Sequence, residues 1–186
     1  MRLILLCILA LSPFSAYADK VVPRFVVSSP DIAPGQVIPQ EFVYNSFGCT
    51  GNNESPALNW KHPPKGTQAF AVTVHDPDAP TGGAGFWHWV VINLPSTLTG
   101  LARGDGALNS THLPPGAVQI RNDFGQASWD GPCPPVGDKP HHYNFTVYAL
   151  KKMLMVPADA TASYVGFMIN SNALASAKFT AMYGRK

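Results

Sequence analysis

Charged side chains are scarce in this chain of 186 residues, and neither sign dominates. Thirteen Lys and Arg residues against eleven Asp and Glu residues leave a formal net charge of +2, and charged residues make up 13% of the chain. That is about half of the usual share in globular proteins. Disorder needs high net charge with low hydrophobicity, and nucleic-acid binding needs a basic stripe. The composition therefore indicates a compact protein that does not bind nucleic acid.

Room for long helices is also lacking, because the chain holds 18 prolines and 16 glycines. Together they make up roughly 18% of the residues, against about 12% in average usage. Frequent proline and glycine residues interrupt helices and therefore favour short strands joined by loops of fixed conformation. We find no internal repeat, heptad pattern or interdomain linker, so we expect one mainly β domain over residues 19–186.

One apolar run stands out, at residues 3–11, behind the basic start Met1-Arg2. Ala16-Tyr17-Ala18 follows with the small-x-small pattern that signal peptidase cleaves. A membrane anchor is the alternative, but the run is far shorter than the about 20 residues that span a bilayer. We therefore predict a signal peptide over 1–18, cleavage after Ala18, and a periplasmic or secreted protein. With no second apolar segment or basic amphipathic helix, we expect a monomer or homodimer without stable membrane association.

Only three cysteines are present, and loss of the leader removes Cys7 and leaves Cys49 and Cys133. In an exported protein such a pair predicts one disulfide. Two unpaired buried side chains are the alternative. A catalytic thiol is less favoured, because Pro132 and Pro134 flank Cys133 and indicate a structural turn.

Residue patterns predict a succession of strands with a single helix. Residues 142–150 alternate most clearly, with 143, 145, 147 and 149 on one face. Residues 95–117 are polar and rich in Gly and Pro, which predicts a long irregular loop on the surface. Strands are expected over 20–29, 42–44, 58–60, 70–75, 86–94, 118–120, 142–150 and 175–183, and a helix near 159–172, capped by Asp159 or Thr161.

Two rigid segments carry the titratable side chains. In Asp76-Pro77-Asp78-Ala79-Pro80 the prolines hold the preceding residues extended, which fixes two carboxylates at the mouth of a sheet. We expect Asp76 to face a cavity and Asp78 to stabilise the loop. The segment 131–143, rich in Pro and Gly, delivers His141 and Tyr143 onto one strand face.

His88 is the third candidate, and strand alternation places it on a face with Phe86 and Val90. A single histidine at such a position is more often part of the core. Because Asp76 and His141 are also candidates, we expect His88 to lie with them in one binding site. Tyr183 could reach the same mouth.

With these motifs in order, the sequence resembles the phosphatidylethanolamine-binding protein family, also called the Raf kinase inhibitor protein family, in its exported bacterial branch. The resemblance rests on residues 76–80, on Trp87-His88-Trp89 leading to Asn93, and on residues 131–143. The chain departs from the animal members at His142, where they typically have Arg, and it lacks their long C-terminal helix region. The phospholipid and kinase partners of the animal members are therefore not carried over to this chain.

The resemblance implies two antiparallel β-sheets packed as a sandwich with one or two short peripheral helices. It also implies a pocket for a small anionic or phosphorylated ligand, and no cofactor, metal or catalytic residue. Imidazole and phenol donors suit phosphate oxygens, and a carboxylate can orient an imidazole or accept from a ligand ammonium. The implied pocket residues are Asp76, His88, Pro135, His141 and Tyr143.

The function expected is that of a non-enzymatic protein that binds a small phosphorylated or carboxylated ligand, with modulation of another protein as a further option; the sequence names neither the ligand nor such a partner. One alternative is a metal-dependent enzyme, since two His and one carboxylate also form a metal-binding triad. Another is a secreted interaction protein that acts through its surface loops.

Overall fold

The structure is a computed structural model, and it describes residues 23–186. The expected signal peptide and its cleavage site lie outside the described residues. In chain order the elements are β1 (Val26–Ser28), the 3-10 helix η1 (Gln40–Phe42), β2 (Leu58–Lys61), β3 (Ala69–Asp76), β4 (Phe86–Pro95), β5 (Gly100–Leu101), β6 (Val118–Gln119), β7 (His141–Leu150), α1 (Ala162–Asn172) and β8 (Ala173–Tyr183).

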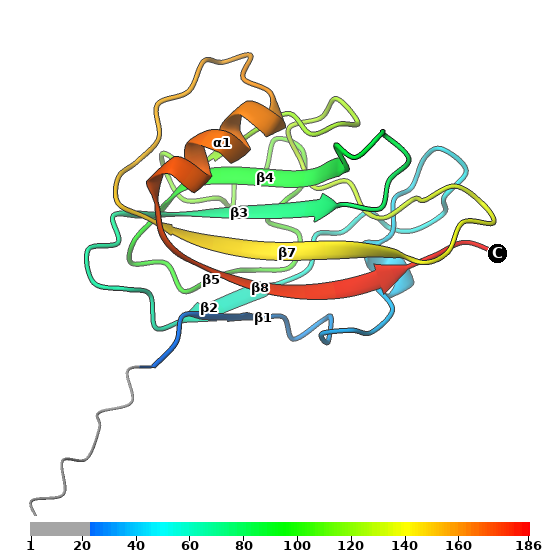
Figure 1. Ribbon diagram of the computed structural model, residues 1–186, viewed down its shortest axis with the longest axis horizontal. Coiled ribbons are helices and arrows are strands. Elements are labelled where there is room, and N and C mark those ends of the chain that lie inside the picture. The colour runs from blue at the N-terminus through cyan, green and yellow to red at the C-terminus, as the bar shows by residue number, and fades with distance from the viewer. Residues whose placement is uncertain (1–22) are drawn as a thin grey trace, which may run out of the picture.

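Two antiparallel sheets form the framework, as expected (Figure 1). The larger sheet has the strand order β6-β4-β3-β7-β8, and the smaller has the order β1-β2-β5. The central strands β3 and β4 are rich in Val, Ile and aromatic residues and are buried over most of their length, as strands covered on both faces must be.

The main core lies between the two sheets. Trp60 from β2 packs on Phe70 from β3 at 5.3 Å between ring centroids, and Phe145 stacks on Phe179 at 4.8 Å. The predicted alternation of β7 is confirmed, because its residues 143, 145, 147 and 149 all belong to this core. Burial of one strand face thus fixes the register of the sheet.

The other face of the large sheet is covered by α1 (Figure 1). Its Val165 and Ile169 pack on Ala71 and Ile92 of the sheet. Thr161 caps the helix by accepting a hydrogen bond from the Tyr164 N–H at 3.2 Å, which confirms the predicted helix and one of its two candidate caps. Among the described residues no helix is long and apolar enough to span a bilayer.

Two predicted strands differ in the structure. The strand predicted over 20–29 is shorter in the structure, where β1 covers only Val26–Ser28. The part of this prediction before residue 23 lies outside the described residues. The strand expected over 42–44 is wrong: Gln40–Phe42 is a 3-10 turn. The Phe42 N–H donates to Pro39 O at 3.1 Å, and the Tyr44 N–H donates to Pro132 O at 3.2 Å, so this segment pairs with loops instead of entering a sheet.

The central strands bring three chain segments together at one end of the large sheet. Asp76 ends β3 and pairs with Phe86, where β4 begins, and His141 begins the neighbouring β7. Because these neighbours run antiparallel, the end of β3 meets the beginnings of β4 and β7. The loops over 77–85 and 120–140 therefore surround the same end, on the right of Figure 1.

Candidate functional site

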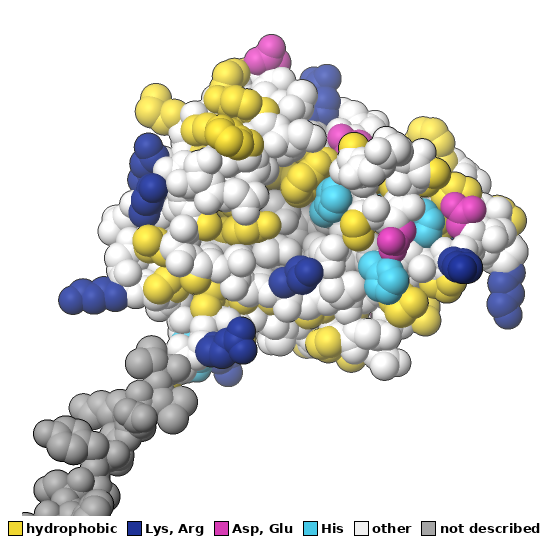
Figure 2. Space-filling model, viewed as in Figure 1, with side chains coloured by type: hydrophobic (Ala, Val, Ile, Leu, Met, Phe, Trp, Pro, Cys, Tyr) yellow, Lys and Arg dark blue, Asp and Glu magenta, His cyan; other side chains and the backbone are white. Residues whose placement is uncertain are grey.

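A cavity of about 410 Å³ opens where these strand ends and loops meet. Histidine and acidic side chains gather on the corresponding part of the surface, whereas Lys and Arg are scattered (Figure 2). All five pocket residues implied by the resemblance line the cavity: Asp76, His88, Pro135, His141 and Tyr143.

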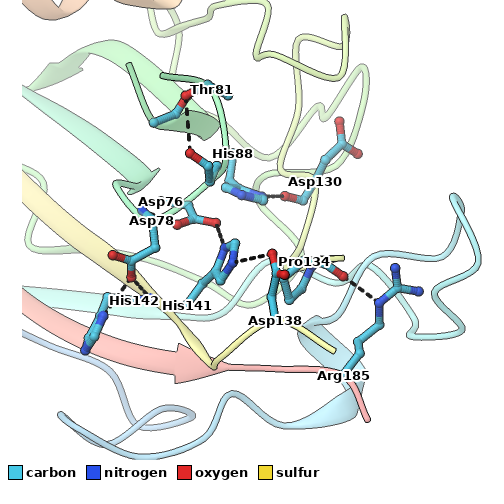
Figure 3. Close-up of polar contacts among 12 residues, drawn as sticks. Asp76, Asp78, Thr81, His88, Asp130, Pro134, Asp138, His141, His142 and Arg185 are labelled. Carbon is cyan, nitrogen blue, oxygen red and sulfur yellow. Dashed lines mark hydrogen bonds and ion pairs between the residues drawn. The ribbon is translucent and has the colours of Figure 1, made fainter. Parts of the chain in front are cut away.

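Asp76 and His141 form a buried pair in the cavity wall (Figure 3). The His141 Nδ1 donates to Asp76 Oδ2 at 2.7 Å, and the two residues are 4% and 3% exposed. Asp76 Oδ1 accepts from the Asp78 N–H at 2.8 Å, which fixes the carboxylate plane. The other ring nitrogen, Nε2, lies 3.4 Å from Asp138 Oδ2, so carboxylates face both nitrogens of His141.

His88 reaches the cavity because β4 has an irregular register at this point. Val74 pairs with Trp89 and His75 with Trp87, which leaves His88 as an extra residue on β4. Such a bulge redirects a side chain. His88 therefore points to the cavity with Phe86, as expected, but Val90 packs under the helix on the opposite face, so that part of the prediction is wrong.

The hydrogen bonds of His88 define its role. Its Nδ1 donates to the Asp130 carbonyl at 2.7 Å (Figure 3), and the Asp130 N–H donates back to His88 O at 3.0 Å. Burial lowers the pKa of His88 below its ordinary value, although Asp130 and the nearby Asp76 carboxylate oppose this shift. The ring is thus neutral at neutral pH, with Nε2 left for a ligand.

A network that the sequence reasoning missed holds Asp130 in place. Its carboxylate accepts from Asn53 Nδ2 at 3.0 Å and from Asn122 Nδ2 at 2.8 Å. Asn53 Oδ1 also accepts from the Gly131 N–H at 2.8 Å. Asn122 begins the loop that leads to Asp130, which is a local signal, but Asn53 comes from a distant part of the chain.

Tyr143 carries an unpaired polar group. The residue is 0% exposed, and its hydroxyl makes no hydrogen bond within residues 23–186. Burial raises the pKa of Tyr143, and the adjacent Asp76 carboxylate raises it further. The phenol is therefore a neutral hydrogen-bond donor in the cavity wall beside the Asp76 carboxylate, and either that carboxylate or a bound ligand can accept from it.

Aromatic rings form the apolar part of the wall, and the sequence reasoning did not single them out. Phe124 packs edge-on to Phe86 at 4.7 Å and to His88 at 5.5 Å between ring centroids. Phe47 lies 5.8 Å from Phe124 and is well exposed at the rim. The cavity thus combines a polar floor with an aromatic mouth.

A disulfide supports the remaining wall. Cys49 and Cys133 are bonded, with 6.0 Å between their Cα atoms, and Cys133 lines the cavity beside Pro135. Arg185 donates from Nε to Pro134 O at 2.6 Å and from Nη1 to Gly48 O at 3.1 Å. Both sides of the disulfide are therefore attached to Arg185, in the segment that follows β8.

Two further sequence candidates, Asp78 and Tyr183, lie outside the cavity. Asp78 accepts from the N–H and the Nδ1 of His142, each at 2.7 Å, and so ties its loop to β7 as expected. The Tyr183 hydroxyl donates to Gln40 Oε1 at 3.4 Å, and Tyr183 does not line the cavity. Within the described part of the chain, no three His, Cys, Asp or Glu side chains are grouped as metal ligands.

The family model for "Phosphatidylethanolamine-binding protein" matches residues 28–184, which include every part of the cavity. The chain belongs to this family. Membership confirms the resemblance drawn from the three motifs.

Relatives within the family match over most of their length. YbcL of Escherichia coli (strain K12) is 48% identical over 182 residues, 97% of each chain, and YbhB of the same organism is 44% identical over 156 residues, 83% of this chain and 97% of YbhB. The crystal structure of E. coli YbcL superimposes with a TM-score of 0.84 at 50% identity, covering 87% of this chain and 99% of that one. CT736 from Chlamydia trachomatis gives 0.72 at 27% identity, with 87% and 98% covered.

Proposed function

We propose that this protein is exported and binds a small oxyanion, phosphate or a phosphoryl headgroup, without changing it chemically. The observation that carries the proposal is the unpaired hydroxyl of Tyr143 in the cavity wall. A phosphoryl oxygen is a strong acceptor and would satisfy this buried donor.

The buried imidazole of His88 adds a second contact. Its Nδ1 is engaged with Asp130, so only Nε2 can meet a ligand. A neutral ring accepts at Nε2 from a P–OH group, and a protonated ring donates to a P–O⁻ group. Either way one proton lies between His88 and the phosphoryl oxygen.

The charge of the wall selects among phosphoryl ligands. No Lys or Arg lines the cavity within the described residues, whereas Asp76 and Asp123 do. A bare dianion would meet these carboxylates unfavourably, but a ligand that carries an ammonium beside its phosphoryl group would pair with them. The aromatic mouth at Phe86 and Phe124 can cover an apolar extension of such a ligand.

Export is supported by two independent features. The first 18 residues have the pattern of a cleaved leader. The disulfide between Cys49 and Cys133 is typical of an oxidising compartment such as the periplasm.

Calorimetric titration with inorganic phosphate and with O-phosphorylethanolamine tests the proposal. We expect saturable binding by the mature protein, tighter for O-phosphorylethanolamine, and no binding by the double variant Asp76→Asn/His141→Gln. The exposed His112 lies outside every motif and the cavity, so His112→Ala is the matched control.

Circular dichroism establishes that the double variant is folded, and ³¹P NMR follows the phosphoryl group during incubation. Binding that survives in a folded double variant would place the ligand elsewhere and would favour action through the surface loops. Conversion of O-phosphorylethanolamine would overturn the non-enzymatic role.

A further inference from the structure

Both ring nitrogens of His141 face carboxylates of this chain, although the residue lines the cavity. Its Nδ1 lies 2.7 Å from Asp76 Oδ2, and its Nε2 lies 3.4 Å from Asp138 Oδ2 (Figure 3). His88 lines the same cavity, but its Nδ1 is engaged by the Asp130 carbonyl and its Nε2 is left for a ligand. In this arrangement His88 offers a nitrogen to a ligand, whereas Asp138 covers the nitrogen that His141 would offer.

The two carboxylates beside His141 are held very differently. Asp76 is 3% exposed, and its Oδ1 also accepts from the Asp78 N–H at 2.8 Å. The side chain of Asp138 is 43% exposed, and within residues 23–186 its carboxylate contacts no cationic or donor side chain besides His141. The distance of 3.4 Å is long for a charge-assisted hydrogen bond, which is typically about 2.7–2.9 Å. Asp76 is therefore a fixed part of the wall, whereas Asp138 makes a loose contact that another acceptor can replace.

The loop holds Asp138 at the edge of the cavity and leaves its side chain free to turn outward. The Asp138 N–H donates to Pro135 O at 3.4 Å, in a turn that begins at the cavity wall. Gly137 has a φ of +87°, which glycine adopts without strain and which completes this turn. Exposed side chains change rotamer within nanoseconds. The carboxylate can therefore leave His141 for solvent without any movement of the backbone.

The contact that Asp138 makes has the same chemistry as the contact of a bound oxyanion. A carboxylate and a phosphoryl group both present anionic oxygens that accept from an imidazole N–H. Exchange of the Asp138 oxygen for a ligand oxygen would leave His141 with the same type of partner on each nitrogen. The ligand would then touch His141 as well as His88 and Tyr143, which line the same cavity.

We propose that Asp138 is an internal substitute for the ligand oxyanion on His141 Nε2, and that the ligand binds there by displacing it. This inference rests on the function proposed above and deepens it, because it makes Asp138 a residue that determines specificity. After displacement the carboxylate still lies near the rim, and Asp76 and Asp123 are in the wall. Together they disfavour a bare phosphate dianion more than a phosphoryl group that carries its own ammonium.

Calorimetric titration with O-phosphorylethanolamine and with inorganic phosphate tests this role, using a variant that keeps the shape of the side chain. Asp138→Asn should bind O-phosphorylethanolamine about tenfold more tightly than the wild type, because a neutral amide competes less well for the imidazole. The gain for inorganic phosphate should be larger, since a like charge is removed as well. Asp159→Asn removes the same charge from an exposed position outside the cavity and should bind both ligands as the wild type does.

Acetate provides a second test that does not depend on the phosphoryl ligand. Asp138→Ala removes the internal carboxylate, and free acetate should take its place on His141. Acetate is added up to about 50 mM, because a ligand with so few atoms binds in the millimolar range. We expect it to shift the imidazole ¹H–¹⁵N signals of His141 in Asp138→Ala and to leave them in place in the wild type and in Asp159→Ala.

The outcomes separate this inference from the proposed function. If the wild type and Asp138→Asn bind O-phosphorylethanolamine equally, the role of Asp138 is overturned and the proposed function stands. If neither binds it, the proposed function fails, and the acetate titration then decides whether His141 Nε2 is an anion contact. A His141 signal that responds to acetate in the same way in all three proteins overturns the displacement.

Discussion

Replacing Tyr143 by Phe removes one oxygen atom from the wall of the cavity that we propose to bind an oxyanion (the oxyanion cavity), and it leaves the ring in place. Because that oxygen is buried without a partner in residues 23–186, its removal relieves a desolvation penalty. We expect the free energy of unfolding to rise by about 1 kcal/mol, at the low end for such a group. The same change deletes a hydrogen bond to a charged phosphoryl oxygen, so the Kd for O-phosphorylethanolamine should increase about 10- to 100-fold.

The two effects have opposite signs, which makes the variant informative. Thermal unfolding should show a midpoint raised by roughly 2–4 °C, and calorimetric titration should show the weaker binding. Tyr148→Phe is the matched control, since Tyr148 lies on the same strand but on the face toward α1. A Tyr143→Phe protein that is less stable and binds as tightly as the wild type would show that the hydroxyl donates to Asp76 and not to a ligand.

Four other outcomes follow from the geometry. Affinity for O-phosphorylethanolamine should rise as the pH falls from about 7.5 to 5.5, because the depressed pKa of His88 keeps this ring neutral until acid pH and the protonated ring holds an anion better. In calorimetry, His88→Ala should weaken binding and flatten this pH dependence, and a dependence that survives in His88→Ala would contradict the assignment to His88. Labelling of the denatured, unreduced mature protein should find no free thiol, and two reactive thiols would contradict the pairing of Cys49 with Cys133. Replacing both cysteines by Ser should lower the free energy of unfolding by about 4 kcal/mol, because the disulfide closes a loop of 84 residues. Gly131→Ala should cost about 3 kcal/mol in urea unfolding, since its methyl would lie 2.0 Å from a carbonyl oxygen of the 3-10 turn; unchanged stability would disprove that contact. The mature protein should remain in the supernatant when anionic vesicles are sedimented at physiological salt, and robust pelleting would refute the absence of stable membrane association.

The parts of the fold that follow a local rule were predictable from the sequence. Strands β3 and β7 have residue patterns set by which faces are buried, and α1 begins at a Thr that can cap it. The cavity residues in the two rigid loops were predictable for a similar reason, because proline and glycine constrain the backbone next to Asp76 and His141.

The remainder of the site depends on contacts between distant segments. His88 points into the cavity only because β4 carries an extra residue relative to β3, and that offset is a property of the pair of strands. Asn53 holds Asp130 from 77 residues away, and Phe47 meets Phe124 across a similar distance. No local pattern marks such residues, so only the structure identifies them.

Three core strands meet at the oxyanion cavity, and this arrangement offers a way to identify the natural ligand experimentally. Asp76, His88 and Tyr143 belong to strands that run through the centre of the large sheet, so a molecule that bridges them binds only while the whole sheet is intact. By mass action, a ligand at about 100 times its Kd would then add about 2.7 kcal/mol to the stability of the entire domain. A rise in the melting temperature of the protein can therefore guide the fractionation of a cell extract toward the natural ligand, whatever the chemistry of that ligand.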